Sequence, residues 1–231
     1  HEVNTPIGSG ITASTLLQKS IEDIKVLFDA KQLKPAQLSK FLDEGIQNTG
    51  IIFRNLERAA KLVNGFKQVA VDQSSDQDRS FKVAQMLDET LLSLSPNFHG
   101  INHSMSVNCS DSLEIYSKPG PLSQVIINLV MNSIKHGFCD VDQGKMNINV
   151  TSDEDNITLV YRDNGIGVEH ALQKVIYDPF VTTKRGSGST GLGMQIVYNI
   201  VTQALGGTIS LKSEVNAGIE FTIVFPRDVR S

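Results

Sequence analysis

The sequence predicts an α+β protein in two parts: an N-terminal antiparallel helical hairpin and a C-terminal α/β sandwich. Three observations lead to this prediction. Apolar residues recur at alternating spacings of three and four over roughly the first 70 positions, as in coiled helices. A polar stretch without periodicity follows, and alternating strand patterns mixed with helical ones fill the rest. We place the hairpin at residues 1–73 and the sandwich at residues 74–231.

Composition excludes several classes of protein. The 231 residues are 40% hydrophobic and 20% charged, as in a globular protein, and the net charge of −4 gives no reason to expect nucleic acid as a partner. The two cysteines have no metal-ligand spacing, which favours a reducing compartment. No apolar run reaches about 18 residues, so we expect no direct membrane contact. Because the chain begins abruptly within an expected helix, we expect a cytoplasmic fragment, whose parent protein can carry an inner-membrane anchor.

The hairpin prediction depends on two heptad series separated by a short polar stretch that contains Pro35. The first series is Val3, Ile7, Gly10, Ser14, Leu17, Ile21, Ile24 and Phe28, and the second is Leu38, Leu42, Gly45, Thr49, Ile52, Leu56, Ala59, Val63, Phe66 and Ala70. Small residues near the middle of both series would allow close helix approach. A lone hairpin leaves much apolar surface open, so we expect a homodimeric four-helix bundle. The alternative is a hairpin packed on its own downstream domain.

His1 lies far from this apolar seam, on a stripe shared with Thr5 and Gly8, and is predicted to face solvent beside Glu2. An exposed histidine next to a carboxylate is ordinarily a surface residue. A neutral imidazole is also a good nucleophile near neutral pH, and a neighbouring carboxylate can orient it and stabilise its developing charge. Pro6 is expected to bend the helix one turn after His1.

The second part combines helices with a mixed sheet of about five strands. The expected helices are at residues 81–94, 121–136 and after residue 193, and the expected strands are at residues 105–109, 113–115, 146–150, 157–161, 208–214 and 220–225.

The helix at residues 121–136 is apolar nearly all round, so its polar stripe needs partners. The stripe comprises Gln124, Asn128, Asn132 and Lys135. One interpretation is a set of buried amides bonded to backbone. The other is a Mg²⁺ site, since Mg²⁺ prefers oxygen ligands and keeps several waters, so that one amide oxygen and nucleotide phosphates would suffice. Lys135 would then reach for phosphate.

Two glycine-containing turns suggest a site that binds the base and the phosphates of a nucleotide. Asp163 ends a strand before Gly165 and Gly167, and can either cap a turn or accept a hydrogen bond from the amine of adenine. The run at residues 186–193 provides backbone N–H groups at a helix start, which suits phosphate oxygens. It matches the dinucleotide fingerprint, but no buried strand precedes it and no Lys-Ser/Thr follows, so neither a Rossmann turn nor a P-loop is predicted. The long connection at residues 170–190 suggests a lid.

Five motifs in order resemble the core of bacterial sensor histidine kinases, and the resemblance covers essentially the whole chain. They are residues 1–6 (the phosphoacceptor box), 128–136 (the asparagine box), 163–167 (the first glycine box), 178–184 (the phenylalanine box) and 188–194 (the second glycine box). The sequences of residues 54–60 and 66–73 resemble those of a subgroup often found in multidomain hybrid kinases.

The resemblance implies an ATP-binding sandwich of the gyrase, Hsp90, histidine kinase and MutL type, with ATP and Mg²⁺ as cofactors. By position, Asn132 would ligate Mg²⁺ and Asp163 would bind the adenine amine. The other residues expected at the nucleotide are Asn128, Lys135, His136, Gly165, Gly167, Phe180, Lys184, Gly188, Thr190, Gly191, Leu192, Gly193 and Thr222. The final glycine box, at residues 216–219, departs from the family pattern. We expect the nucleotide pocket to form despite this departure.

The implied reaction is in-line phosphoryl transfer from ATP to His1, oriented by Glu2, and then to an aspartate of a response-regulator receiver domain. Glu2 and Thr5 fit a pattern that also implies a phosphatase role toward that partner. Asn128 stands where ATP-hydrolysing relatives carry glutamate, and an amide cannot take a proton from water. Transfer is therefore favoured over hydrolysis. The alternatives are an ATP-dependent conformational clamp and a nucleotide-binding dimeric scaffold.

Overall fold

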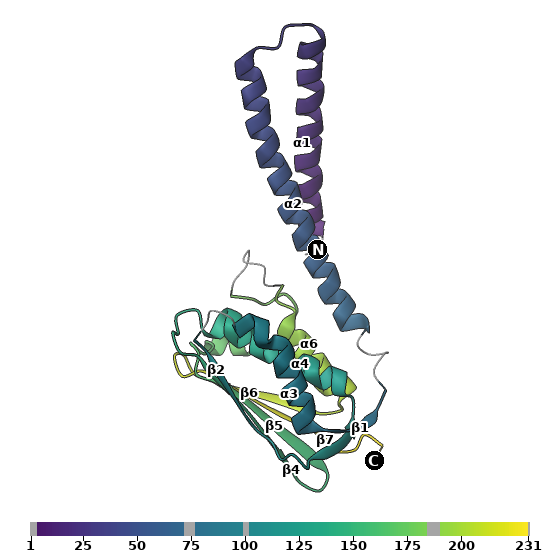
Figure 1. The fold of residues 1–231 in the computed structure, drawn as a ribbon, viewed down its shortest axis with the longest axis vertical. Helices are drawn as coiled ribbons and strands as arrows, with labels where there is room; N and C mark the ends of the chain where they lie inside the picture. The colour runs from purple at the N-terminus through teal and green to yellow at the C-terminus, as the bar shows by residue number, and fades with distance from the viewer. Residues whose placement is uncertain (1–3, 72–76, 99–101, 184–189, 231) are drawn as a thin grey trace. The chain divides into compact units, whose positions relative to one another are not determined.

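The computed structural model describes residues 4–71, 77–98, 102–183 and 190–230. The chain divides into two compact units, His1–Lys67 and Gln68–Ser231 (Figure 1). The boundary predicted between residues 73 and 74 falls outside the described residues. Across the described ranges, no helix is long and apolar enough to cross a membrane.

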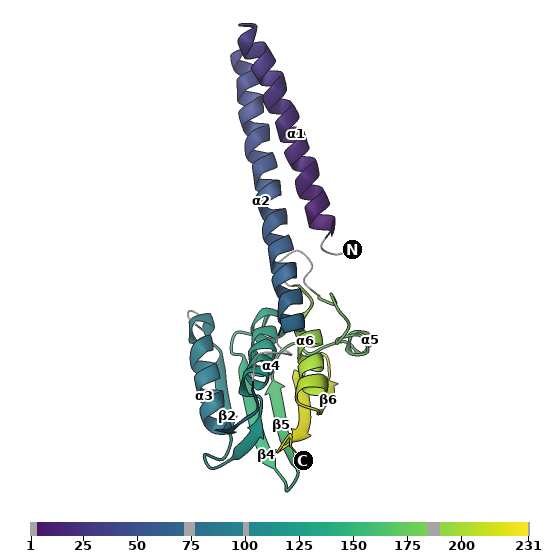
Figure 2. The ribbon, with the colours of Figure 1, turned by 90° about the vertical axis from the view of Figure 1, so that its right-hand side faces the viewer.

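The first unit is a hairpin of two long helices, α1 (Asn4–Asp29) and α2 (Pro35–Val71), which lie antiparallel in both ribbon views (Figures 1 and 2). The connection turns at Lys31, which adopts a positive φ of 55°. The helices approach each other at the two predicted glycines: a Cβ on Gly10 would lie 3.9 Å from Asn55 Cβ, and one on Gly45 would lie 3.9 Å from Leu17 Cδ1.

The contact between α1 and α2 is narrower than the predicted seam. Ala13 is buried in it, whereas its neighbour Ser14, a predicted seam residue, is exposed. Two helices bury only the stripe where they meet, and the predicted stripe was wider than that. The predicted seam residues that remain exposed include Ile7, Ile21, Phe28, Leu38, Leu42 and Leu56.

The second unit contains a five-stranded mixed sheet and a two-stranded sheet. The five-stranded sheet has the order β2 (Ser104–Asn108), β4 (Lys145–Ser152), β5 (Asn156–Asp163), β7 (Ile219–Pro226) and β6 (Thr208–Ser213), with β2 parallel to β4 and the other pairs antiparallel. Strands β1 (Arg79–Lys82) and β3 (Glu114–Ser117) pair antiparallel to form the small sheet. The expected sheet of about five strands is confirmed.

Phe81 begins no helix, contrary to the sequence-based prediction. It lies in β1 and pairs with Ile115, and α3 (Val83–Leu94) begins two residues later. A four-residue strand is too short for its alternation to be read beside a strong helical pattern. A short 3₁₀ turn, η1 (Ser95–Phe98), follows α3.

Helices α3, α4 (Pro119–Asn132) and α6 (Gly193–Asn199) cover one face of the large sheet (Figures 1 and 2). The core lies between these layers, because alternate strand residues such as Ile148, Leu159 and Ile223 are fully buried against the helices. Two helices continue as π turns, α4 into η2 (Ser133–Gly137) and α6 into η3 (Ile200–Ala204). The predicted helix at residues 121–136 is therefore α-helical only as far as Asn132.

Replacing Ile148 by alanine tests this core. Ile148 is fully buried at the centre of β4, so Ile148→Ala is expected to lower the free energy of unfolding by about 2–5 kcal/mol. Val107→Ala is the control, because Val107 is 37% exposed on β2 and its change is expected to stay within about 0.5 kcal/mol. Urea titration followed by circular dichroism measures both, and similar losses for the two variants would contradict the assigned core.

Candidate functional site

A cavity of about 740 Å³ lies in the second unit, beside the end of β5 and the start of β7. One wall comes from α4 and η2, and another from the start of α6. The segment that follows β5, including α5 (His170–Gln173), contributes further residues to the lining. The cavity is lined by Asn128, Asn132, Lys135 and Asp163, which the sequence analysis singled out.

Helix α4 supplies the polar wall. Pro119 lies at the start of the helix, where its fixed φ favours the first turn and its missing N–H would have no partner. Asn128 and Asn132 are four residues apart, so they lie on one face and both line the cavity, while Ile126 and Val130 are buried in the core. The helical spacing therefore gives one polar face and one apolar face, as predicted.

Among the described residues, the hydrogen bonds of the two amides involve their NH₂ groups and leave their oxygens available. Asn128 Nδ2 donates to the carbonyl of Gln124 at 3.0 Å, and Asn132 Nδ2 donates to Met194 Sδ at 3.1 Å. Both Oδ1 atoms lie close to the first residue of α6: a Cβ built on Gly193 would be 3.4 Å from that of Asn128 and 3.5 Å from that of Asn132. Two oxygen acceptors therefore converge where a helix begins.

This donor set suits Mg²⁺ held partly by other oxygens. Among the residues that the structure describes, no group of three His, Cys, Asp or Glu side chains is placed to hold a metal ion. Mg²⁺ needs few protein ligands when phosphate oxygens and waters complete its octahedron. The free oxygen of Asn132 fits that role.

Asp163 ends β5 at the cavity and is held by several donors. Gly165 N donates to its Oδ1 at 2.9 Å, and the Ser133 hydroxyl donates to its Oδ2 at 2.5 Å. Burial raises the pKa of the Asp163 carboxyl, against the lowering effect of hydrogen bonds from Ser133, Gly165 and Ile219. The carboxyl is therefore fixed in position and exposed to the cavity.

Ser133 and Tyr161 were missed by sequence reasoning. Ser133 is buried at the start of η2, and its hydroxyl lies 2.7 Å from that of Tyr161. Tyr161 precedes Asp163 by two residues in β5, so the two side chains point to the same face of the sheet. That spacing was readable from the sequence, whereas the contact with Ser133 depends on how α4 packs on the sheet.

Glycine is required where the site is most tightly built. A Cβ on Gly165 would lie 2.6 Å from the carbonyl oxygen of Gly137, which accepts a hydrogen bond from Ile166 N at 2.9 Å. Gly165 therefore admits the backbone of η2. Gly191 has a φ of 67°, and its Cβ would lie 2.6 Å from the backbone of Phe180.

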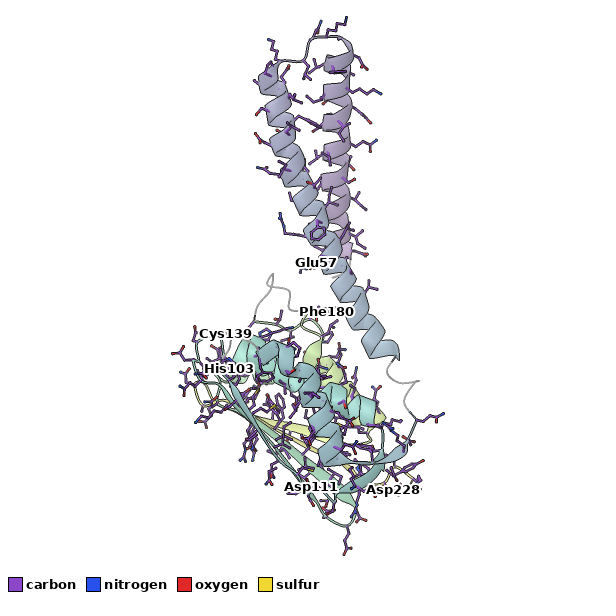
Figure 3. All side chains as sticks on the ribbon, viewed as in Figure 1. Glu57, His103, Asp111, Cys139, Phe180 and Asp228 are labelled. Carbon is purple, nitrogen blue, oxygen red and sulfur yellow. The ribbon has the colours of Figure 1, made fainter. Side chains whose placement is uncertain are left out.

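The connection after β5 partly covers the cavity. Val181, Thr182 and Thr183 line it, and Thr183 Oγ1 lies 3.3 Å from His136 Nδ1 on η2. Phe180, labelled in Figure 3, has a positive φ of 66° and packs against the hydrophobic core. The described part of the segment predicted to be a lid therefore contacts both η2 and the core.

The structure gathers most of the predicted nucleotide-site residues around this one cavity. Those that line it are Asn128, Asn132, Lys135, His136, Asp163, Gly167, Thr190, Gly191 and Gly193. Gly165, Phe180 and Leu192 lie next to lining residues without lining the cavity themselves. Predicted residues His1, Glu2, Lys184 and Gly188 lie outside the described residues, and Thr5 is exposed on the other unit.

Thr222 lies outside the candidate site. It alternates along β7 with Phe221 and Ile223, whose side chains are buried beneath the helices, so Thr222 faces the other side of the sheet. The lining residues that lie outside the predicted motifs and the predicted lid are Gly137, Asp140, Val168, Glu169, Val215 and Phe221.

Comparison with known proteins shows what this arrangement resembles. Residues 117–229 match the family model for histidine kinase-, DNA gyrase B- and HSP90-like ATPases. Sporulation kinase A of Bacillus subtilis strain 168 is 29% identical over 194 residues, which cover 83% of this chain and 31% of that protein. The chain spans 31–35% of the length of three such curated relatives.

Solved structures share the fold. The catalytic domain of histidine kinase ThkA superposes with a TM-score of 0.58 at 24% identity, covering 66% of this chain and 97% of that one. ThkA in complex with response regulator protein TrrA gives a TM-score of 0.61 at 22% identity, covering 98% of this chain and 59% of that one.

Residues 117–229 therefore resemble ATPases of the histidine kinase, gyrase and HSP90 type, and the second unit has the fold of a histidine kinase catalytic domain. With the helical hairpin that precedes this region, the chain is similar over most of its length to sporulation kinase A and, in fold, to histidine kinase ThkA.

Replacing Asp163 by asparagine tests the site. Asp163→Asn is expected to weaken ADP binding by about 10- to 100-fold at pH 7, because a charged acceptor for the base amine is lost. In the wild type, ADP affinity should fall as the pH drops through the raised pKa of Asp163, whereas the variant should lack this acidic limb. Isothermal titration calorimetry between pH 5 and 8 measures both.

The same variant has an opposite expected effect on stability. Since the pKa of Asp163 is higher in the folded than in the unfolded state, stability falls as the pH rises from the ordinary value of 3.8 to the raised one, and then stays level. Asp163→Asn should therefore melt no lower than the wild type at pH 7. A large fall in melting temperature would show that the carboxylate stabilises the fold and would contradict this account.

Proposed function

We propose that this chain transfers the γ-phosphoryl group of ATP to its own His1, as a protein histidine kinase, and passes it to an aspartate of a response-regulator receiver domain. The observation that carries the proposal is the convergence of Asn132, Asp163 and Gly191 on one cavity. An amide oxygen suited to Mg²⁺, a carboxyl suited to an amine, and a glycine turn at a helix start are the parts that a nucleotide site needs.

Different residues of the cavity would bind different parts of the nucleotide. Asp163 would accept a hydrogen bond from the adenine amine, and the backbone around Gly191 and Gly193 would bind phosphate oxygens. Lys135, which is exposed at the cavity, would neutralise phosphate charge. Mg²⁺, held by Asn132 and phosphate oxygens, would stabilise the charge of the transferring group.

The identity of residue 128 favours transfer to a side chain over hydrolysis. Asn128 commits its NH₂ group to Gln124 and presents only an amide oxygen toward the cavity. An amide oxygen cannot remove a proton from water, so the site offers no general base at this position. The acceptor must then come from outside the cavity, and His1 on the hairpin is the proposed nucleophile, with Glu2 orienting its imidazole.

The hairpin is the proposed platform for both the acceptor and the partner. Thr5 is exposed and follows His1 by four residues in the sequence, and we propose that it acts with Glu2 on a phosphorylated receiver domain as a phosphatase. The neighbour ThkA was solved with response regulator protein TrrA, which supports a partner of this kind. We place these reactions in the cytoplasm, where ATP is supplied.

The exposed apolar residues of the hairpin support a homodimer. Leu42, Ile46, Phe53 and Leu56 are each more than half exposed and lie along the same side of α2. This side differs from the one that faces α1, so a second copy could cover it and complete a four-helix bundle.

Labelling with γ-labelled ATP and Mg²⁺ tests the kinase. The wild-type chain and its full-length parent are expected to acquire an acid-labile, alkali-stable label, which His1→Gln abolishes while nucleotide binding remains. Asn132→Ala should lose both label and Mg²⁺-dependent binding. Steady phosphate release without labelled protein would instead support an ATP-driven clamp, and binding without either would support a scaffold.

A charge on the open side of α2 tests the dimer. Leu42→Glu places an unpaired carboxylate on the proposed interface and is expected to convert a dimer to a monomer, as measured by light scattering after gel filtration. Gln47→Glu is the matched control, because Gln47 is exposed on the opposite side of α2 and should leave the dimer intact. A wild-type chain that is monomeric at high micromolar concentration would contradict the proposal.

A further inference from the structure

We propose that Tyr161 and Ser133 are positioning residues that set the base specificity of the nucleotide site. They hold the Asp163 carboxyl as an acceptor of hydrogen bonds, so that it takes the amine of adenine and rejects guanine. This inference rests on the proposed function, because it concerns the same cavity.

The three side chains form a continuous buried chain. Tyr161 is fully buried and Ser133 is 3% exposed, and their hydroxyl oxygens lie 2.7 Å apart. Ser133 Oγ lies 2.5 Å from Asp163 Oδ2, and Asp163 also lines the cavity. We call these residues the Tyr161–Ser133–Asp163 chain. It connects the interior of the core to the group that meets the base.

The number of protons available fixes the direction of hydrogen bonding in the Tyr161–Ser133–Asp163 chain. An ionised carboxyl can only accept, so the single proton of the Ser133 hydroxyl is donated to Asp163. The carbonyl of Leu129, at 3.3 Å from Ser133 Oγ, is also only an acceptor. The Ser133 oxygen can then only accept from Tyr161, whose hydroxyl must donate. Both donations stabilise a negative charge on Asp163.

The direction of the chain determines which base fits. At the corresponding position adenine carries an amine, a donor, whereas guanine carries a carbonyl oxygen, an acceptor. An acceptor-only carboxylate therefore pairs with adenine and leaves guanine facing a like partial charge. A protonated carboxyl could donate to the guanine oxygen, and burial favours protonation. Loss of the Ser133 hydroxyl would remove the hydrogen-bond donor that opposes protonation of Asp163.

Among the residues that the structure describes, few other charged groups surround the Asp163 carboxyl. Its remaining hydrogen bonds come from the backbone at Gly165 and, on β7, at Ile219, and Tyr161 lies on its own strand. The titratable side chains that line the same cavity are Lys135 and His136 on η2, Asp140 after it, and Glu169 before α5. The hydroxyl of Ser133 is thus the side-chain donor in direct contact with Asp163.

The test compares ADP and GDP binding by calorimetry from pH 5 to 8 for the wild type, Ser133→Ala, Tyr161→Phe and the double variant. Ser117→Ala and Tyr177→Phe are matched controls. Both of those hydroxyls are buried, and neither has a hydrogen-bond partner among the described residues. The controls therefore remove the same atoms without touching the Tyr161–Ser133–Asp163 chain.

Ser133→Ala is expected to weaken ADP binding about tenfold at pH 7 without weakening GDP binding, and to shift the acidic limb of the ADP profile to higher pH. Tyr161→Phe should have a smaller effect of about threefold in the same direction. The double variant should bind like Ser133→Ala, because Tyr161 acts only through Ser133. It should also melt higher than Ser133→Ala, in which the buried Tyr161 hydroxyl is left without a partner.

Two results would overturn the inference. One is an unchanged ADP-to-GDP ratio in Ser133→Ala, and the other is an equal loss of both nucleotides, which indicates a merely structural role. Failure of the wild-type chain to bind ADP at all would instead overturn the proposed function, together with the inference.

Discussion

The close packing of η2 against the end of β5 is the constraint on which the rest of the site depends. Gly165 leaves room for the carbonyl of Gly137, and that carbonyl accepts a hydrogen bond from Ile166 N. The same contact brings Ser133 to Asp163. A bulkier residue at position 165 would separate the helix that carries the amides from the strand that carries the carboxyl, and the cavity would lose its shape.

Much of this arrangement could be predicted from sequence, because its signals are local. The spacing of Asn128 and Asn132 defines a helix face, and Asp163 stands at the end of an alternating strand. The roles of Gly165 and Thr222 could not be assigned in the same way. Which backbone approaches Gly165 is a long-range fact, and Thr222 lies on the far face of β7 because the register places Phe221 and Ile223 toward the helices.

The hairpin shows a different limit of sequence reasoning. A heptad pattern marks every position that can be buried, but it does not say by which neighbour. Gly10 and Gly45 lie close to the opposite helix as expected, whereas Phe28 and Leu42 remain more than half exposed. The apolar stripe is wider than one pair of helices can cover. The apolar residues left over stay exposed in a single chain.

The narrow seam between α1 and α2 has a thermodynamic consequence. An isolated hairpin that leaves so much apolar surface in water gains little from folding, so the proposed association would supply the missing free energy. The melting temperature of the first unit should then rise with protein concentration, while that of the second unit, with its own closed core, stays constant. Dilution would thus destabilise the helical hairpin while leaving the second unit folded.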